Sequence, residues 1–162
     1  MQRFFELNKI DEVEQARVFS NKFSVKMERL PQGPGTSGDY IVVQTKNDAY
    51  PLNTVVEFKN DKSSQRTGNL FLECEQTSDN WFTRKKSGIA LATYQNQLVV
   101  IKSGRENFII RNRDEFAGLI NKSHRTLTTR SGANGNSHGC YSRGHLVKRE
   151  HARNLLDSYL IE

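Results

Sequence analysis

Hydrophobic and polar positions follow two periods along the first half of the chain. Between Asn8 and Asn21, apolar side chains recur at helical spacing, which predicts a helix capped by Asn8 or Asp11. From residue 23 onward, apolar and polar positions alternate, and turn-forming stretches interrupt the alternation. The pattern therefore predicts strands at residues 23–30, 39–45, 54–60 and 69–75, with a polar loop at 61–68.

The second half of the chain mixes both periods. Residues 98–102 and 107–111 predict a hairpin across Ser103 and Gly104, and residues 114–121 predict a short helix. Residues 131–139 are rich in Gly and Asn, which is typical of a loop. The apolar stripe from Ala152 to Leu160 predicts a terminal helix. This order of elements favours a single mixed α/β (α+β) domain over residues 1–162, with a mixed central sheet flanked by helices.

Charge and composition narrow the class of protein. The 162 residues fit one domain, and 24 Lys and Arg against 18 Asp and Glu leave a net charge of +6. Most of the basic excess follows residue 80, and a basic surface binds phosphates by releasing counterions. We therefore expect a nucleic-acid partner, with a merely solvated basic face as the alternative. We expect a cytoplasmic protein without membrane contact. The chain has only two cysteines, which is typical of a reducing compartment, and it shows neither an apolar run of membrane length nor a secretory signal.

Two acids and a lysine form the most informative group. Asp39 starts one predicted strand, while Glu57 and Lys59 share a face of the next strand. Antiparallel pairing around a turn centred at Ala49 would place residue 39 opposite residue 59 and bring the three side chains together. The neighbouring Val56 would then face the other way, into a core, as would Phe58.

This group suits phosphodiester hydrolysis. Two carboxylates can hold Mg²⁺, which favours oxygen ligands and retains several waters. The adjacent Lys59 can orient or help deprotonate the attacking water and offset charge on the phosphorane. The alternative is an ordinary surface salt bridge, because most E-x-K tripeptides lie on solvated strand faces.

The same residues carry a family resemblance. G-D-Y-I-V-V at 38–43 followed by V-V-E-F-K at 55–59 resembles the D…E-x-K signature of the PD-(D/E)XK nuclease superfamily, with Gly38 in place of proline. A second block, T-G-N-L-F-L-E at 67–73 with K-S-G-I at 86–89, resembles small phage-encoded or bacterial proteins regarded as nucleases of that superfamily.

The resemblance covers about residues 38–101. It implies a restriction-endonuclease-like core and DNA cleavage with Mg²⁺, for which Mn²⁺ can substitute. It assigns Asp39 and Glu57 as metal ligands and Lys59 as the residue that positions the water. Glu73 becomes an additional acid that supports this metal or a second ion.

Other acids offer alternative ligand sets. Glu73 and Glu75 are predicted to share a face of their strand, so that Asp61 with both would form a D…E-x-E set. Glu14 on the first helix is a further candidate for the metal shell. A zinc site is not predicted, because the spacing of the available ligand types does not match zinc knuckles; these are His138, Cys140, His145 and His151.

The remaining expectations concern substrate and partners. Basic residues at 84–86 and within 111–153 would grip the DNA backbone, and the 132–139 loop would order on DNA. The aromatic residues beside 84–86 would stack on bases or cover a sheet edge; they are Trp81, Phe82 and Tyr94. A homodimer would provide two active sites. The competing functions are a non-catalytic basic nucleic-acid-binding protein and a phage accessory protein that binds a host protein.

Overall fold

A computed structural model describes residues 2–32, 38–77, 84–130 and 141–161, with the backbone alone at 2–10, 84 and 130. The helices in these ranges are α1 (Gln2–Phe23), α2 (Ser63–Thr67), α3 (Gly88–Tyr94), α4 (Arg113–Ile120) and α5 (Arg149–Leu155). The strands are β1 (Val25–Arg29), β2 (Tyr40–Thr45), β3 (Val55–Asn60), β4 (Asn69–Thr77), β5 (Arg84–Lys86), β6 (Leu98–Ser103), β7 (Glu106–Ile110), β8 (Arg125–Arg130), β9 (Tyr141–Lys148) and β10 (Asp157–Leu160).

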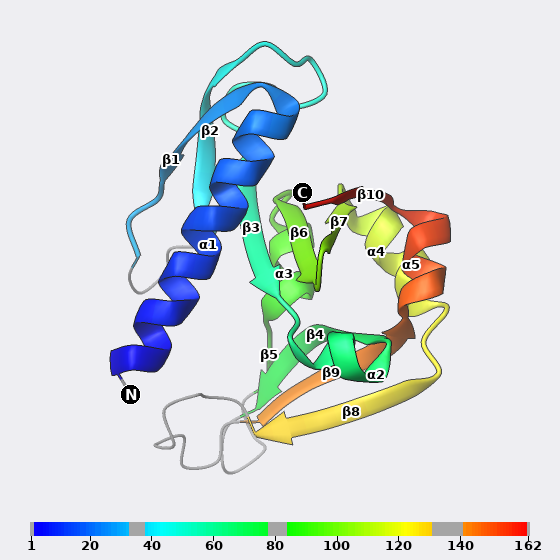
Figure 1. The fold of residues 1–162 in the computed structure, drawn as a ribbon. Coiled ribbons are helices and arrows are strands. Elements are labelled where there is room, and N and C mark those ends of the chain that lie inside the picture. Colours follow the sequence, from blue (N-terminus) through cyan, green and yellow to red (C-terminus); the bar gives the residue numbers. More distant parts are fainter. Residues whose placement is uncertain (1, 33–37, 78–83, 131–140, 162) are drawn as a thin grey trace.

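The strands form two sheets. The first sheet has six strands in the order β1-β2-β3-β6-β7-β10, in which β3 and β6 are parallel and the other neighbours antiparallel. The second sheet is antiparallel, in the order β5-β4-β9-β8. Figure 1 shows α1 along β3 of the first sheet, with α2 beside the second sheet. The predicted mixed α+β fold with a mixed central sheet is confirmed, while the separate second sheet was not predicted.

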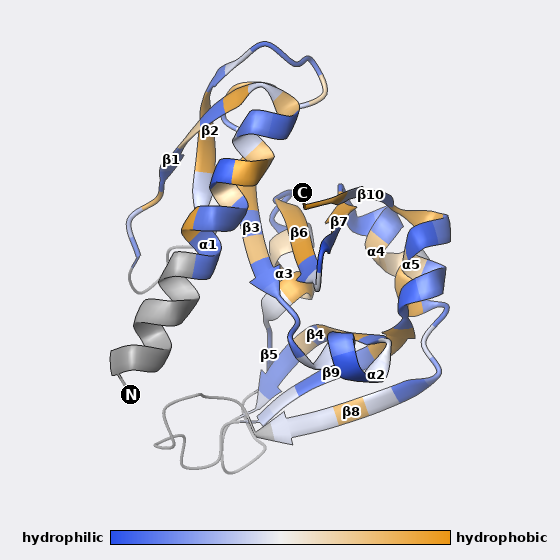
Figure 2. Ribbon diagram, viewed as in Figure 1, coloured by the Kyte–Doolittle hydropathy of each residue, from blue (hydrophilic) through white to orange (hydrophobic). Residues whose placement is uncertain are grey.

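The first sheet has a hydrophobic core on each face. One core lies under α1 and contains Phe19, Val56 and Phe58. The other contains Val99 and Ile101 of β6 together with residues of β4, α3, α4 and α5. Figure 2 shows hydrophobic residues gathered on β6, whereas α2 is hydrophilic. The predicted alternation in β3 is confirmed, because Val56 and Phe58 are buried in the first core while Glu57 and Lys59 are only partly buried.

Several predicted boundaries were wrong. The first helix begins at Gln2, so neither Asn8 nor Asp11 caps its start. The predicted loop at 61–68 contains α2. The predicted terminal helix ends at Leu155, and the next residues form β10, which pairs with the edge of β7. Strand pairing prevails there because it satisfies the edge of β7 and buries Tyr159 in the first core.

The hairpin of β6 and β7 and the helix α4 confirm the predictions for residues 98–121 within one or two residues. The pattern missed α3, β5, β8 and β9. The 131–139 segment lies outside the described residues, as do Trp81, Phe82, His138 and Cys140.

Candidate active site

Asp39, Glu57 and Lys59 line one cavity of about 190 Å³ beside the start of β2 and the end of β3. The pairing of Tyr40 with Val56, extended by one residue, places Asp39 opposite Glu57. The prediction of Asp39 opposite Lys59 was therefore wrong by two residues. The three side chains still meet, because Glu57 and Lys59 share a face of β3. Lys59 Nζ lies 3.1 Å from Glu57 Oε1.

The Asp39 carboxyl group is held against β3. It is only 7% exposed, and its Oδ2 accepts a hydrogen bond of 2.7 Å from the Phe58 N–H. Burial, reinforced by the charge of Glu57, raises the pKa of Asp39 to about 7 despite this hydrogen bond.

Gly38 allows the close approach of Asp39. Its φ is +87°, a left-handed conformation, and a Cβ at this position would lie 2.3 Å from Val55 Cγ1. Proline holds φ near −65° and adds bulk. The backbone at this position therefore favours glycine over proline or a residue with a Cβ.

Lys59 is held as an ammonium ion by its neighbours. Burial opposes its charge, but the Glu57 carboxylate, by charge and hydrogen bonding, and the charges of Glu73 and Asp39 raise the pKa of Lys59 overall. On the backbone, Gln15 of α1 donates a hydrogen bond of 3.1 Å from Nε2 to the Lys59 carbonyl. Sequence reasoning missed Gln15, although it precedes Ala16 on the predicted apolar stripe and is 3% exposed.

Glu73 approaches the site from the second sheet. It lies on β4 against Gly88, where an added Cβ would be 2.5 Å from Glu73 Oε2. Glu73 does not line the small cavity but shares an adjoining larger one with Lys59. Across the described ranges, no group of three His, Cys, Asp or Glu side chains is placed to hold a metal ion. The predicted three-acid set is therefore not brought together, although the charge of Glu73 contributes, after that of Glu57, to the raised pKa of Lys59.

A register shift in β4 separates Glu73 from Glu75. Glu73 pairs with Gly144 of β9, while Glu75 pairs with the adjacent Arg143, and the shift lies between them. Since neighbouring positions of β9 face opposite sides, Glu73 and Glu75 also face opposite sides. The prediction of a shared face was wrong. Glu75 instead lies 3.7 Å from the Arg143 guanidinium group.

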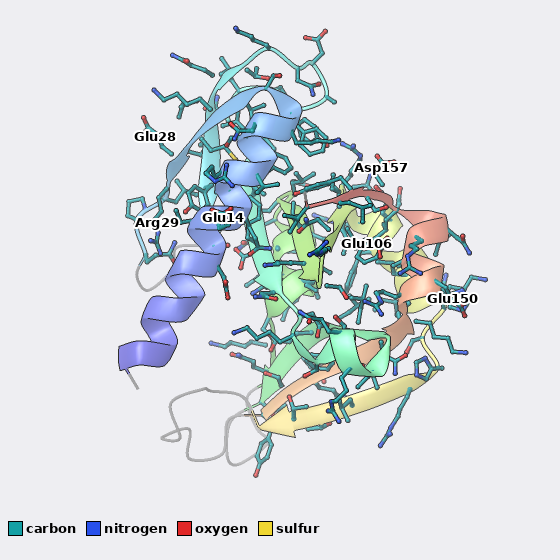
Figure 3. All side chains as sticks on the ribbon, viewed as in Figure 1. Glu14, Glu28, Arg29, Glu106, Glu150 and Asp157 are labelled. Atoms are coloured by element: carbon teal, nitrogen blue, oxygen red, sulfur yellow. The ribbon has the colours of Figure 1, made fainter. Side chains whose placement is uncertain are left out.

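The other two alternative acids have structural partners. Asp61 accepts hydrogen bonds from the Ser64 N–H at 3.1 Å and the Phe71 N–H at 2.8 Å, one to each carboxylate oxygen. Asp61 thereby ties α2 to β4. Glu14 lies on α1 (Figure 3), where it is exposed, pairs with Arg17 and lines neither cavity. Neither acid is placed with Asp39 and Glu57.

Some of the basic residues expected to grip DNA are committed to ion pairs. Arg111 lies 2.8 Å from Asp157, and Arg153 lies 2.9 Å from Glu106. Lys86 and Arg113 instead lie over the exposed ring of Tyr94, at 4.1 and 4.5 Å from its centroid. Tyr94 thus lies beside Lys86, and its role in stacking on bases or covering a sheet edge stays a prediction.

No protein-family model matches the chain, and no curated protein or solved structure matches it either. Within the ranges described, no helix combines the length and the apolar character needed to cross a membrane.

The cavity fits a divalent cation by the chemistry of its donors. Asp39 and Glu57 supply carboxylate oxygens to one space, and their mutual repulsion contributes to the raised pKa of Asp39. Among the described residues no donor contacts Asp39 Oδ1. Oxygen ligands of this kind, completed by waters and a substrate phosphate, are those that Mg²⁺ prefers.

Proposed function

We propose that the protein is a metal-dependent endonuclease that hydrolyses DNA phosphodiester bonds. The observation that carries the proposal is that Asp39, which directly precedes β2, lines one cavity with Glu57 and Lys59 of β3. The resemblance to the PD-(D/E)XK superfamily supports the same reading of these residues. We further expect a cytoplasmic protein of a bacterium or an infected cell, and two such sites in a homodimer would cut both strands of a duplex.

The residues have distinct roles in this proposal. Asp39 and Glu57 would hold Mg²⁺ or Mn²⁺, which polarises the scissile phosphate and lowers the pKa of a water when bound. Lys59 keeps its proton because its pKa is raised, so it orients the water and offsets phosphate charge rather than acting as a base. Glu73 helps to retain the Lys59 proton.

Cleavage of plasmid and of circular single-stranded DNA with Mg²⁺, Mn²⁺, Ca²⁺ or EDTA tests the proposal. Wild type should cut only with Mg²⁺ or Mn²⁺, and Glu57→Gln and Lys59→Ala should lower the rate by about 100-fold or more. Matched controls are Glu28→Gln and Lys26→Ala at exposed positions of β1, which should cut like wild type. DNA binding at low salt is measured for every variant.

Each other outcome contradicts either the proposed activity or the site assigned to it. Binding without cleavage under any metal would establish a non-catalytic nucleic-acid-binding protein. Absence of both binding and cleavage would favour a protein partner. Cleavage that survives both active-site substitutions would place the chemistry elsewhere in the chain.

A further inference from the structure

A larger cavity of about 680 Å³ adjoins the candidate active site. It lies between the end of β3, α2 and the second sheet, and α2 packs against β4 there (Figure 1). Lys59 and Gly88 line both cavities. A ligand in the larger cavity would therefore reach the proposed reaction centre without leaving the protein surface.

One wall of the larger cavity is apolar and partly exposed. Phe71 of β4 pairs with Leu146 of β9, and Leu127 of β8 pairs with Gly144, so all these positions share one face of the second sheet. Gly144 leaves room for the ring, because a Cβ there would lie 2.7 Å from Phe71 Cε2. A partly exposed ring with aliphatic neighbours provides a stacking surface for a nucleobase, whatever its identity.

The side of the cavity formed by α2 is polar and carries two cations. Arg66 of α2 and Lys62, which directly precedes α2, line it together with Thr67. Thr129 lies on the same face of the second sheet as Leu127, and the carboxylates of Asp61 and Glu73 also line the cavity. Lys62 is 3.8 Å from Asp11, whereas Arg66 is exposed and has no ion-pair partner in the part of the chain that the structure describes. The cavity thus offers a base-stacking wall facing cations that can bind a phosphate backbone.

We infer that this stacking groove, defined by Phe71, Leu127, Leu146, Arg66 and Thr129, binds an unpaired nucleotide next to the scissile phosphate. Cavities of roughly 300–1,000 Å³ hold small molecules, so the volume suits one or two nucleotides but excludes the body of a duplex. The preferred substrate is then single-stranded DNA or a single-stranded extension. This inference rests on the proposed function for the position of the cut.

A groove-filling substitution tests the inference with a matched control. Thr129→Trp would place an indole in the groove, while Thr128→Trp would place it on the opposite face of the same strand, where Thr128 is exposed. The probes are fluorescent oligothymidylate of about 12 nucleotides and a blunt duplex of equal length. Fluorescence anisotropy is recorded in Ca²⁺ and in EDTA, so that binding is measured separately from cleavage.

A charge substitution provides a second, independent test. Arg66→Gln removes a cation from the groove, and Lys26→Gln removes one from an exposed position on β1. A general electrostatic effect would weaken binding equally in both variants. A groove that holds the strand predicts a larger loss for Arg66→Gln.

The expected result is tighter binding of the single strand than of the duplex, weakened about tenfold or more by Thr129→Trp and unchanged by Thr128→Trp. Equal binding of the two probes, or equal effects of the two tryptophans, would overturn the inference. Duplex-preferring cleavage with an active Mg²⁺ site would overturn it while leaving the proposed function intact. Single-strand binding that depends on the groove, without cleavage under any metal, would support the inference about the groove and overturn the proposed function.

Discussion

Replacing Asp39 by asparagine should change how stability depends on pH. The asparagine can still accept the Phe58 N–H hydrogen bond but carries no charge. The pKa of Asp39 rises from 3.8 to about 7 on folding, because the carboxyl group is buried beside Glu57. Between these values the folded state binds the proton more tightly than the unfolded state, so the contribution of Asp39 to stability falls as the pH rises.

The magnitude follows from the two pKa values. Each pH unit of difference corresponds to about 1.4 kcal/mol, so complete ionisation of Asp39 costs the folded state about 4 kcal/mol. Wild type and Asp39→Asn should respond similarly below pH ~4. Above pH ~7, the variant should have gained up to about 4 kcal/mol in free energy of unfolding relative to wild type.

Urea unfolding in EDTA across this pH range measures the difference. Asp48→Asn, an exposed turn residue, is the matched control and should follow wild type throughout. Addition of saturating Mg²⁺ at pH 8 should stabilise wild type and not Asp39→Asn, because ligand binding to the folded state adds to its stability. Identical pH dependence of wild type and Asp39→Asn would refute the reasoning about burial and charge at this site.

Three further substitutions test the surroundings of the site. Gly38→Ala should lower the free energy of unfolding by about 1–3 kcal/mol, because φ is +87° and Val55 blocks a Cβ; an unchanged urea midpoint would contradict this. Asp61→Ala should cost about 1–3 kcal/mol by leaving two backbone N–H groups unpaired, with Mg²⁺ affinity by calorimetry unchanged; weakened Mg²⁺ binding would make it a ligand. Glu75→Gln should leave plasmid cleavage unchanged and cost at most about 1 kcal/mol, and a large loss of cleavage would show that Glu75 reaches the site.

The periodicity of the chain determined the local features of the site. Side-chain alternation in β3 separates Val56 and Phe58 from Glu57 and Lys59, and the structure confirms this separation. The β6–β7 hairpin was predictable for the same reason, since its strands are adjacent in sequence. Such features depend on side-chain direction and short turns, which a few neighbouring residues specify.

Pairing between segments far apart in the sequence determined the remaining features of the fold and of the site. β4 pairs with β9, about seventy residues later in the chain, and the register shift in that pair turns Glu75 away from Glu73. An available edge on β7 makes residues 157–160 a strand despite their helical stripe. The stacking groove exists only where α2 and β3 meet the second sheet. Local periodicity cannot specify these features because their hydrogen bonds and burial come from partners far away in the sequence.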